Sequence, residues 1–456
     1  MHHRFYMKIK FLTSCLVVAF FYTWYNPCQA QSGQGTTAVR VTPEFTRSLI
    51  DSLGQSLRKY YIFPDTAGKM LTYLVHEFQT GAYNEIKDPV ALADHLFKDL
   101  QKAHHDGHLR LNYDPEMAMR LGDTSGQKDR RRIGDSMNLI RARENNFGFS
   151  KVEVLSGNIG YVAFSNFIGP VKEATHTFTA AFSFLSNTRA LIIDLRKNGG
   201  GSPAMVSRVE SYFFPVKTHL NDIVDRLAGT RVMWTDPERT GGVILQMPVY
   251  ILTSHGTFSG AEDFTYGLQS VKRATVVGDT TGGGAHPTGT FNVGMGFVAN
   301  IPIARSLNPY THTDWEGIGV IPDIPVPSVN ALEAAEKAIF TQQLAQAATK
   351  SDRRIAQWQL DNFRALQSSE ILDSINLLPY TGTYQGGLDF YVLGHDLYCR
   401  NAERGNQKFR LMHITGNLFQ LDENVQVEFT KDATGKFSAI TMFWSNGNES
   451  YKSKLE

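Results

Sequence analysis

A single serine lies where a strand-like run of residues meets a helix-like run. Apolar residues 248–253 precede Ser259, and apolar residues then recur at helical spacing from Ala261 to Val271. A serine at such a corner can expose its hydroxyl beside the unpaired N–H groups of the first helical turn, which is the geometry of a nucleophile. The simpler alternative is that Ser259 only caps the helix, with Glu262 completing a capping box. Other parts of the chain must decide between these interpretations.

A glycine run follows the most apolar strand expected in the chain. Residues 190–195 are apolar except for Asp194, as in a strand buried on both sides, and residues 199–201 are all glycine. The run formally fits a dinucleotide fingerprint, but such a fingerprint opens its βαβ unit and has an acidic residue about 20 positions later. We therefore favour backbone N–H groups that converge on an oxyanion over nucleotide binding or a plain tight turn.

Two histidines and an aspartate alternate in the segment before a predicted strand at residues 109–113. His104, Asp106 and His108 would share one side of an extended chain, as metal ligands could. A structural zinc site normally needs four ligands, and no fourth is evident nearby. Proton transfer suits His108 better, because a histidine is the usual partner of an activated serine and need not be close to it in sequence. A surface or capping role for His108 is the simpler alternative.

The amino-acid composition limits the kinds of molecule that the protein is expected to bind. The chain has 456 residues, enough for two or three domains, with 45 Lys and Arg against 44 Asp and Glu. This balance gives a formal net charge of +1 and provides no basic surplus for nucleic acid or for an anionic membrane.

The first 30 residues resemble a secretory signal peptide. A basic start is followed by an apolar run at residues 11–25 and by Ala30, after which we predict cleavage. The alternative is an uncleaved membrane anchor, but the run is shorter than the ~20 apolar residues that span a bilayer. Cleavage would remove Cys15 and Cys28, so that Cys399 has no disulfide partner within the mature chain. We therefore expect an exported protein with no membrane segment after signal removal.

The remainder divides into five predicted segments. Residues 40–113 form an N-terminal helical domain whose first helix begins at Thr42-Pro43. Further along we expect a polar connection at 114–149, an α/β core at 150–345, a helical linker at 346–376 and a small antiparallel β-domain at 377–456.

Four ordered motifs give the core a family resemblance. They are DLRKNGGG at 194–201, GTFSGAE at 256–262, VGDTTGGG at 277–284 and GVIPD at 319–323. Together they resemble the C-terminal processing (tail-specific) serine peptidases, a family that includes the tricorn core protease and the interphotoreceptor retinoid-binding protein. The resemblance covers roughly residues 45–345 and implies a ClpP/crotonase-like α/β core of layered sheet and helices.

The branch of this family determines the expected base. Tail-specific enzymes pair their serine with a lysine 25 residues later, where this chain has Gly284, and usually carry a PDZ domain for which no room exists here. The chain is more similar to the tricorn-like and retinoid-binding-like branch, which implies that His108 is the base and that Glu316 supports it. Tricorn has a serine directly before its histidine, whereas this chain has Gly107, so the contact between Glu316 and His108 is either direct or through water.

The resulting hypothesis is an exported serine endopeptidase that acts on peptides or unfolded protein tails. Ser259 is the nucleophile and His108 the base, and the resemblance implies oxyanion donors at Gly260 and at Gly200 or Gly201. Three further residues are expected to hold the glycine loop: Asp194, Arg196 and Asn198. This mechanism requires no metal or organic cofactor. The sequence is compatible with a homo-oligomer. The alternative is a non-catalytic protein that binds retinoid or fatty acid in the same cleft.

Overall fold

A computed structural model describes residues 39–122, 127–169, 171–367 and 374–455. The predicted signal peptide and its cleavage site at Ala30 lie outside these residues, as do Cys15 and Cys28. Within the described ranges, no helix is both long and apolar enough to cross a membrane.

Three helices open the described chain: α1 (Pro43–Tyr60), α2 (Pro64–Gln79) and α3 (Pro89–Ala103). The cap of α1 is the one expected from the sequence, and α3 is capped in the same way. The Thr42 hydroxyl accepts a hydrogen bond from the N–H of Phe45, and the Asp88 carboxylate accepts one from the N–H of Ala91. Each of the three helices has proline at its first position, where the missing N–H would have no intrahelical partner.

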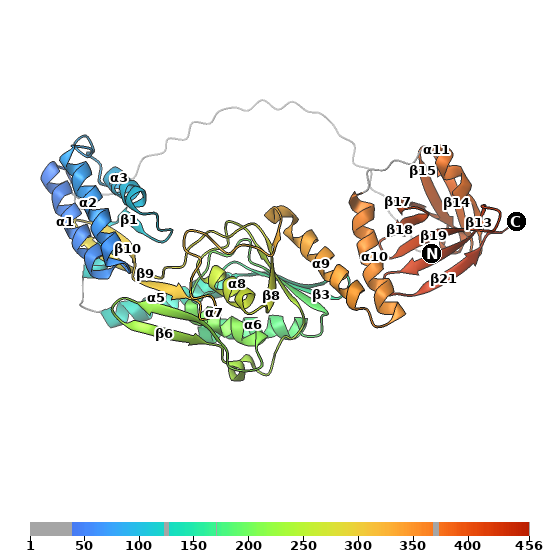
Figure 1. The fold of residues 1–456 in the computed structure, drawn as a ribbon, viewed down its shortest axis with the longest axis horizontal. Helices are drawn as coiled ribbons and strands as arrows, with labels where there is room; N and C mark the ends of the chain where they lie inside the picture. The colour runs from blue at the N-terminus through green and yellow to red at the C-terminus, as the bar shows by residue number, and fades with distance from the viewer. Residues whose placement is uncertain (1–38, 123–126, 170, 368–373, 456) are drawn as a thin grey trace, which may run out of the picture. The chain divides into compact units, whose positions relative to one another are not determined.

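The N-terminal helices share their core with a sheet that is completed from much later in the chain. Strand β1 (Arg110–Tyr113) pairs antiparallel with β10 (Phe297–Pro302), which pairs with β9 (Thr288–Gly294). Apolar side chains of β9 and β10, including Val293 and Ile301, are buried together with those of α1–α3. The predicted boundary at residue 113 therefore does not match the packing. The β9–β10 hairpin comes from the predicted α/β core but packs against the N-terminal helices (Figure 1).

The segment predicted as a polar connection is helical. It contains α4 (Pro115–Gly122) and α5 (Gln127–Glu144), which end in a short turn before β2 (Phe149–Leu155). The prediction missed them because α5 is strongly polar, and only a few apolar residues such as Ala142 anchor it to the neighbouring core.

A six-stranded sheet forms the centre of the α/β part. Its order is β12-β8-β7-β4-β3-β2, with β2 antiparallel to β3 and the other neighbours parallel. Its remaining strands are β3 (Ile159–Phe164), β4 (Ala190–Asp194), β7 (Val249–Thr253), β8 (Ala274–Gly278) and β12 (Ile324–Pro325).

Helices cover both faces of this sheet, which explains the continuous apolar pattern of β4. Leu191 and Ile193 pack towards α6 (Val171–Leu185), α7 (Pro203–Glu210) and α8 (Gly260–Ser270). Ala190 and Ile192 pack on the opposite side towards α9 (Ala331–Gln346). The prediction of a mixed α/β core is confirmed.

A smaller antiparallel sheet that the sequence analysis missed lies beside α8. It contains β5 (His219–Asp225), β6 (Gly229–Trp234) and β11 (Ala304–Leu307), in the order β11-β5-β6. These strands alternate weakly between apolar and polar residues, so the pattern alone does not reveal them.

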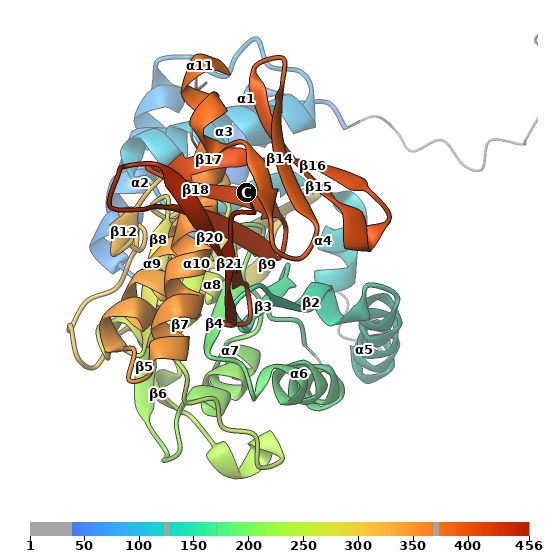
Figure 2. The same cartoon turned by 90° about the vertical axis from the view of Figure 1, so that its right-hand side faces the viewer.

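The C-terminal part contains two antiparallel sheets, in agreement with the predicted β-domain. One contains β13 (Gly382–Tyr384), β14 (Leu388–Leu393), β15 (Asp396–Asn401) and β16 (Gln407–Arg410). The other contains β17 (Met412–Thr415), β18 (Leu418–Asp422), β19 (Val425–Lys431), β20 (Phe437–Trp444) and β21 (Glu449–Ser453). Helix α10 (Lys350–Gln367) packs beside α9, as Figure 2 shows, and buries Trp358 against the second sheet.

Candidate active site

Ser259 occupies a strained corner between β7 and α8. It is the N-cap residue of α8, with φ 53° and ψ −119°. A non-glycine residue in this conformation typically costs about 1–3 kcal/mol and persists only when its neighbours hold it there. Ser259 also lines a pocket of about 260 Å³, so its hydroxyl group lies beside an accessible space.

The glycine run lies directly against this corner. A Cβ on Gly200 would lie 2.7 Å from the backbone nitrogen of Gly260, and a Cβ on Gly260 would lie 3.1 Å from the nitrogen of Gly201. The N–H of Gly200 is already donated to the Asn198 side chain, at 2.9 Å. Among the described residues, no hydrogen bond uses the N–H of Gly201 or Gly260. Of the two alternatives left by the sequence, Gly201 is therefore the one with a free donor beside that of Gly260.

Of the three residues expected to support the loop, Asn198 contacts it directly, and Asp194 and Arg196 hold the end of the strand before it. Asn198 accepts from Gly200 and donates to the carbonyl of Phe164, at 3.0 Å. Asp194 accepts hydrogen bonds from the Arg196 guanidinium and from the hydroxyl of Tyr161. Since Arg196 also donates to the carbonyl of Ser328, at 2.8 Å, the end of β4 is tied to the segment that precedes α9.

Glu262 connects the serine to a second glycine loop. Its buried carboxylate accepts hydrogen bonds from the N–H groups of Ser259, Gly283 and Gly284 and from the hydroxyl of Thr281, at 2.5–2.8 Å. Burial raises the pKa of Glu262, and these hydrogen bonds partly offset that effect. The capping-box residue foreseen in the sequence therefore fixes the backbone of Ser259 as well as the helix.

We predict that Glu262→Gln weakens both folding and activity. An amide replaces one carboxylate oxygen by an NH₂ group, which cannot accept the hydrogen bonds made there. The loss should be about 3 kcal/mol of unfolding free energy, because buried donors left unpaired cost about 1–3 kcal/mol each. Urea unfolding and a casein-cleavage assay would measure the effects. Glu238→Gln, on an exposed residue, is the control; equal stability of the two variants would contradict the prediction.

His108 lines the same pocket as Ser259. Its ring lies against that of Phe258, with 4.7 Å between ring centroids, and its Nδ1 is buried. Burial lowers the pKa of His108 to about 4, a shift that the charge of Asp106 only partly opposes. His108 is therefore neutral at physiological pH, as a base must be. Within the described chain no hydrogen bond joins His108 to Ser259, which is common before substrate binds.

Gly284 occupies the position where tail-specific enzymes have a lysine. A Cβ on Gly284 would lie 2.2 Å from the Phe258 ring and 2.6 Å from Cε1 of His108. No side chain could extend from this position without displacing both rings. The space that a lysine base would need is therefore taken by His108 and by the ring it packs against.

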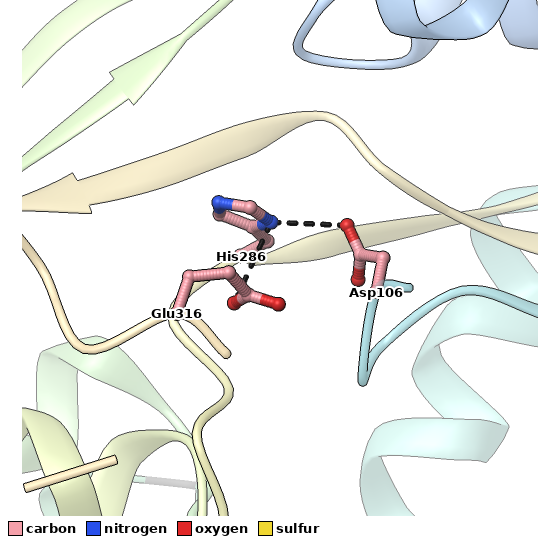
Figure 3. Close-up of side chains that lie close together, drawn as sticks. All are labelled: Asp106, His286 and Glu316. Carbon is pink, nitrogen blue, oxygen red and sulfur yellow. Dashed lines mark hydrogen bonds and ion pairs between the residues drawn. The ribbon is translucent and has the colours of Figure 1, made fainter. Parts of the chain in front are cut away.

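A buried cluster of Asp106, His286 and Glu316 lies behind His108 (Figure 3). Nδ1 of His286 is 3.0 Å from the Asp106 carboxylate and 3.5 Å from that of Glu316. Asp106 also accepts hydrogen bonds from the hydroxyl of Tyr61 and from the N–H of His108, both at 2.9 Å. Glu316 thus reaches the backbone of His108 through His286 and Asp106.

The expected contact between Glu316 and His108 stays a prediction, and the structure adds a connection through His286 and Asp106. In the described part of the chain, no ion pair or hydrogen bond joins Glu316 to the His108 ring. Oε2 of Glu316 instead accepts from the N–H of Ala285, at 2.5 Å, while Oε1 is buried without a partner. Gly107 provides no side chain that could bridge the two residues, which explains why the carboxylate turns towards His286.

Opposing effects set the charges in this cluster. Burial alone would lower the pKa of His286, but the hydrogen bond to Asp106 and the charge of Glu316 raise it above its ordinary value. Burial raises the pKa of Glu316, and the charge of His286 partly offsets this rise. Burial also favours protonation of Asp106, yet its hydrogen bonds, above all that from His286, lower its pKa overall. The hydrogen bond to Asp106 and the charge of Glu316 therefore favour the charged form of His286.

The same three side chains are the ones that could hold a metal ion. Their ligand atoms lie within 4.8 Å of one another. The ligand set considered from the sequence was His104, Asp106 and His108, and of these only Asp106 belongs to the cluster. A cation here would compete with His286 for the carboxylates of Asp106 and Glu316.

Sequence reasoning missed His286 and the loop-binding role of Glu262. His286 follows the glycines of the third motif, but its partner Asp106 is 180 residues away in sequence. A local pattern cannot identify such a pair.

Comparisons with known proteins place two family domains on the chain. The family described as Peptidase family S41 matches residues 158–326, which include Ser259 and Glu316. The N-terminal domain of Peptidase_S41 in eukaryotic IRBP matches residues 37–138, which include His108.

Individual relatives cover smaller parts. Carboxyl-terminal-processing peptidase 2, chloroplastic, of Arabidopsis thaliana is 30% identical over 176 residues, 38% of this chain and 32% of the relative. The carboxyl-terminal-processing protease of Synechocystis sp. is 26% identical over 191 residues, 41% of this chain and 43% of the relative. The chain thus spans less than half the length of these relatives. The solved photosystem II D1 C-terminal processing protease aligns with a TM-score of 0.40 at 17% identity, over 63% of this chain and 94% of that chain.

Proposed function

Because the chain carries a peptidase family S41 domain at residues 158–326 and an S41 N-terminal domain at residues 37–138, we propose that it is a serine endopeptidase. The proposed substrates are peptides or unfolded protein tails. One observation carries the proposal: Ser259 lies at a strained corner beside the free N–H groups of Gly201 and Gly260, in a pocket that His108 also lines.

In the proposed mechanism, Oγ of Ser259 attacks the scissile carbonyl while His108 takes the hydroxyl proton. His108 then gives that proton to the leaving amine, and water hydrolyses the acyl-enzyme by the same steps. The N–H groups of Gly201 and Gly260 bind the oxyanion, each donor contributing about 3 kcal/mol to lowering the barrier. Asn198 holds the adjacent Gly200, and Arg196 ties the end of β4 to Ser328, which together would position the donor of Gly201.

Glu316 is proposed to act as a positioning residue. The hydrogen bond to Asp106 and the charge of Glu316 raise the pKa of His286, and His286 holds the Asp106 carboxylate that binds the N–H of His108. The base is thereby fixed beside the nucleophile. The layered core, with helices on both faces of the sheet, supports a ClpP/crotonase-like arrangement for this part of the chain.

Export is the proposed setting. It is supported by the basic and apolar pattern at residues 1–30, with cleavage after Ala30, and a peptidase in a periplasmic or extracellular space would meet unfolded protein. The proposed chemistry requires no metal or organic cofactor, and a homo-oligomer is compatible with it.

A second candidate function is binding of retinoid or fatty acid without catalysis. The match of residues 37–138 to a domain of eukaryotic IRBP favours it. One experiment distinguishes the two functions: the purified chain is treated with a fluorophosphonate, the labelled residue is identified by mass spectrometry, and casein cleavage is measured. Labelling of Ser259 together with cleavage supports the peptidase. Absence of both, with tight binding of retinol or palmitate, would refute it.

The low pKa of His108 predicts an unusual pH profile. Because the folded protein keeps His108 neutral down to about pH 4, kcat/KM should stay constant from neutral pH to about 5 and fall as the pH drops through about 4. A histidine with an ordinary environment would lose activity through about pH 6.5. An uncharged peptide substrate should be used, and fluorophosphonate labelling after return to pH 7 checks that the protein survives acid. An acidic limb near 6.5 would contradict the prediction.

A further inference from the structure

The pocket beside Ser259 contains a carboxylate that the proposed mechanism does not use. Asp263 lies one helical turn after Ser259, and its backbone N–H donates to the Ser259 carbonyl at 2.9 Å. Its side chain lines the pocket together with Ile223 and Ser306, although only 7% of the residue is exposed. A substrate held by Ser259 would therefore place a side chain within reach of this carboxylate.

The position of the Asp263 carboxylate is fixed by a neighbouring strand. The side-chain amide of Asn221, in β5, donates to Oδ1 of Asp263 at 2.8 Å. Asn221 is itself held by the N–H of Leu307, at 3.2 Å, and by the hydroxyl of Ser306. The Asp263 carboxylate thus belongs to a wall of the pocket whose side chains are held in place by hydrogen bonds.

A second carboxyl group lies behind the first. Glu210, in α7, is 2% exposed, and its Oε1 is buried without a hydrogen-bond partner. Burial and the charge of Asp263 raise the pKa of Glu210, while burial raises the pKa of Asp263 to about 7. Across the described residues, no lysine, arginine or histidine forms an ion pair with either group. Such an uncompensated buried pair shares a proton unless a cation enters.

We propose that this pocket is the primary specificity site and that it binds a cationic side chain, lysine or arginine, at the residue before the scissile bond. The inference rests on the proposed peptidase function. The ammonium or guanidinium group would contact Asp263, and the apolar stem would lie against Ile223 and Pro203. A single small pocket of about 260 Å³ suits one such side chain rather than an organic cofactor.

The test uses fluorogenic peptides that differ only at this position, with lysine, arginine, norleucine or glutamine. We expect kcat/KM for the lysine and arginine peptides to exceed that for norleucine by at least about tenfold, because only a cationic substrate group can pair with the buried Asp263 carboxylate. In Asp263→Asn, which keeps the shape and the contact with Asn221, the ratio of lysine to norleucine should fall towards one. Glu238→Gln is the matched control and should leave the ratio unchanged.

A second measurement needs no variant. Butylammonium or butylguanidinium should inhibit casein cleavage by the wild-type protein, whereas pentanol at equal concentration should not. A wild-type preference for norleucine or glutamine, an unchanged ratio in a labelled Asp263→Asn protein, or equal inhibition by the neutral compound would overturn the inference. If Ser259 is labelled and casein is cleaved, such a result leaves the peptidase function intact. If neither occurs, the peptidase function itself has failed.

Discussion

Replacing Ser259 with alanine is expected to lower casein cleavage by at least about 10⁴-fold, because the nucleophile of an acyl-transfer mechanism has no substitute. The variant should also lose all labelling by fluorophosphonate. Its melting temperature should change little, since alanine retains the same Cβ and the backbone at φ 53° is held by Glu262 rather than by the hydroxyl.

His108→Gln provides the companion measurement. Glutamine can occupy much of the same space beside Phe258 but cannot take and return a proton at neutral pH. We expect a loss of similar size, and a double variant with Ser259→Ala that is no worse than the poorer single one, because residues that act as a unit are not additive. If the double variant instead lost activity by the product of the two single losses, His108 would act in a different step from Ser259. Activity retained by Ser259→Ala would identify another nucleophile.

Substitution by alanine should lower activity at Gly200 but not at the adjacent Gly199. In Gly200→Ala, the added Cβ would lie 2.7 Å from the backbone nitrogen of Gly260 and 2.8 Å from Cβ of Ser259, and φ is +100°. These backbone atoms cannot move without displacing the nucleophile and its oxyanion donor. We expect a loss of at least about 10³-fold in kcat, comparable to removal of an oxyanion donor, and a lower melting temperature.

Gly199→Ala is the matched control, because a Cβ on Gly199 would meet no atom within 4 Å. Steady-state kinetics and thermal unfolding of both variants, made side by side, separate a local clash from a general intolerance of the loop. Similar activity of the two proteins would show that the approach of Gly200 to Ser259 is not needed for catalysis.

The elements whose signals are local could be predicted from the sequence. The caps Thr42 and Asp88 fixed two helix starts, and the unbroken apolar run of β4 indicated a strand covered on both faces. Helix α5 was missed because helical propensity without an apolar stripe resembles a solvated connection. The docking of β9 and β10 against α1–α3 was missed because it depends on pairing between distant segments.

In the candidate site, too, local motifs could be predicted from the sequence but contacts between distant segments could not. Ser259, the glycine runs and Glu262 lie in motifs that can be recognised within a few residues. Whether Gly200 or Gly201 has the free donor depends on one side-chain hydrogen bond of Asn198, which no pattern specifies. The link from Glu316 to His108 through His286 depends on a contact between segments 180 residues apart in sequence.

The pairing of β1 with β10 has a consequence for the order of folding. Asp106 and His286 are 180 residues apart, so the loop that carries His108 reaches its final position only after a very long segment of chain has closed. Closing such a loop costs conformational entropy before the new contacts repay it, and contacts of high sequence separation form slowly. The nucleophile corner can assemble from residues close in sequence, but the base arrives late. A newly synthesised chain would therefore complete its catalytic site only after residues 286–302 have been made and have packed against the N-terminal helices.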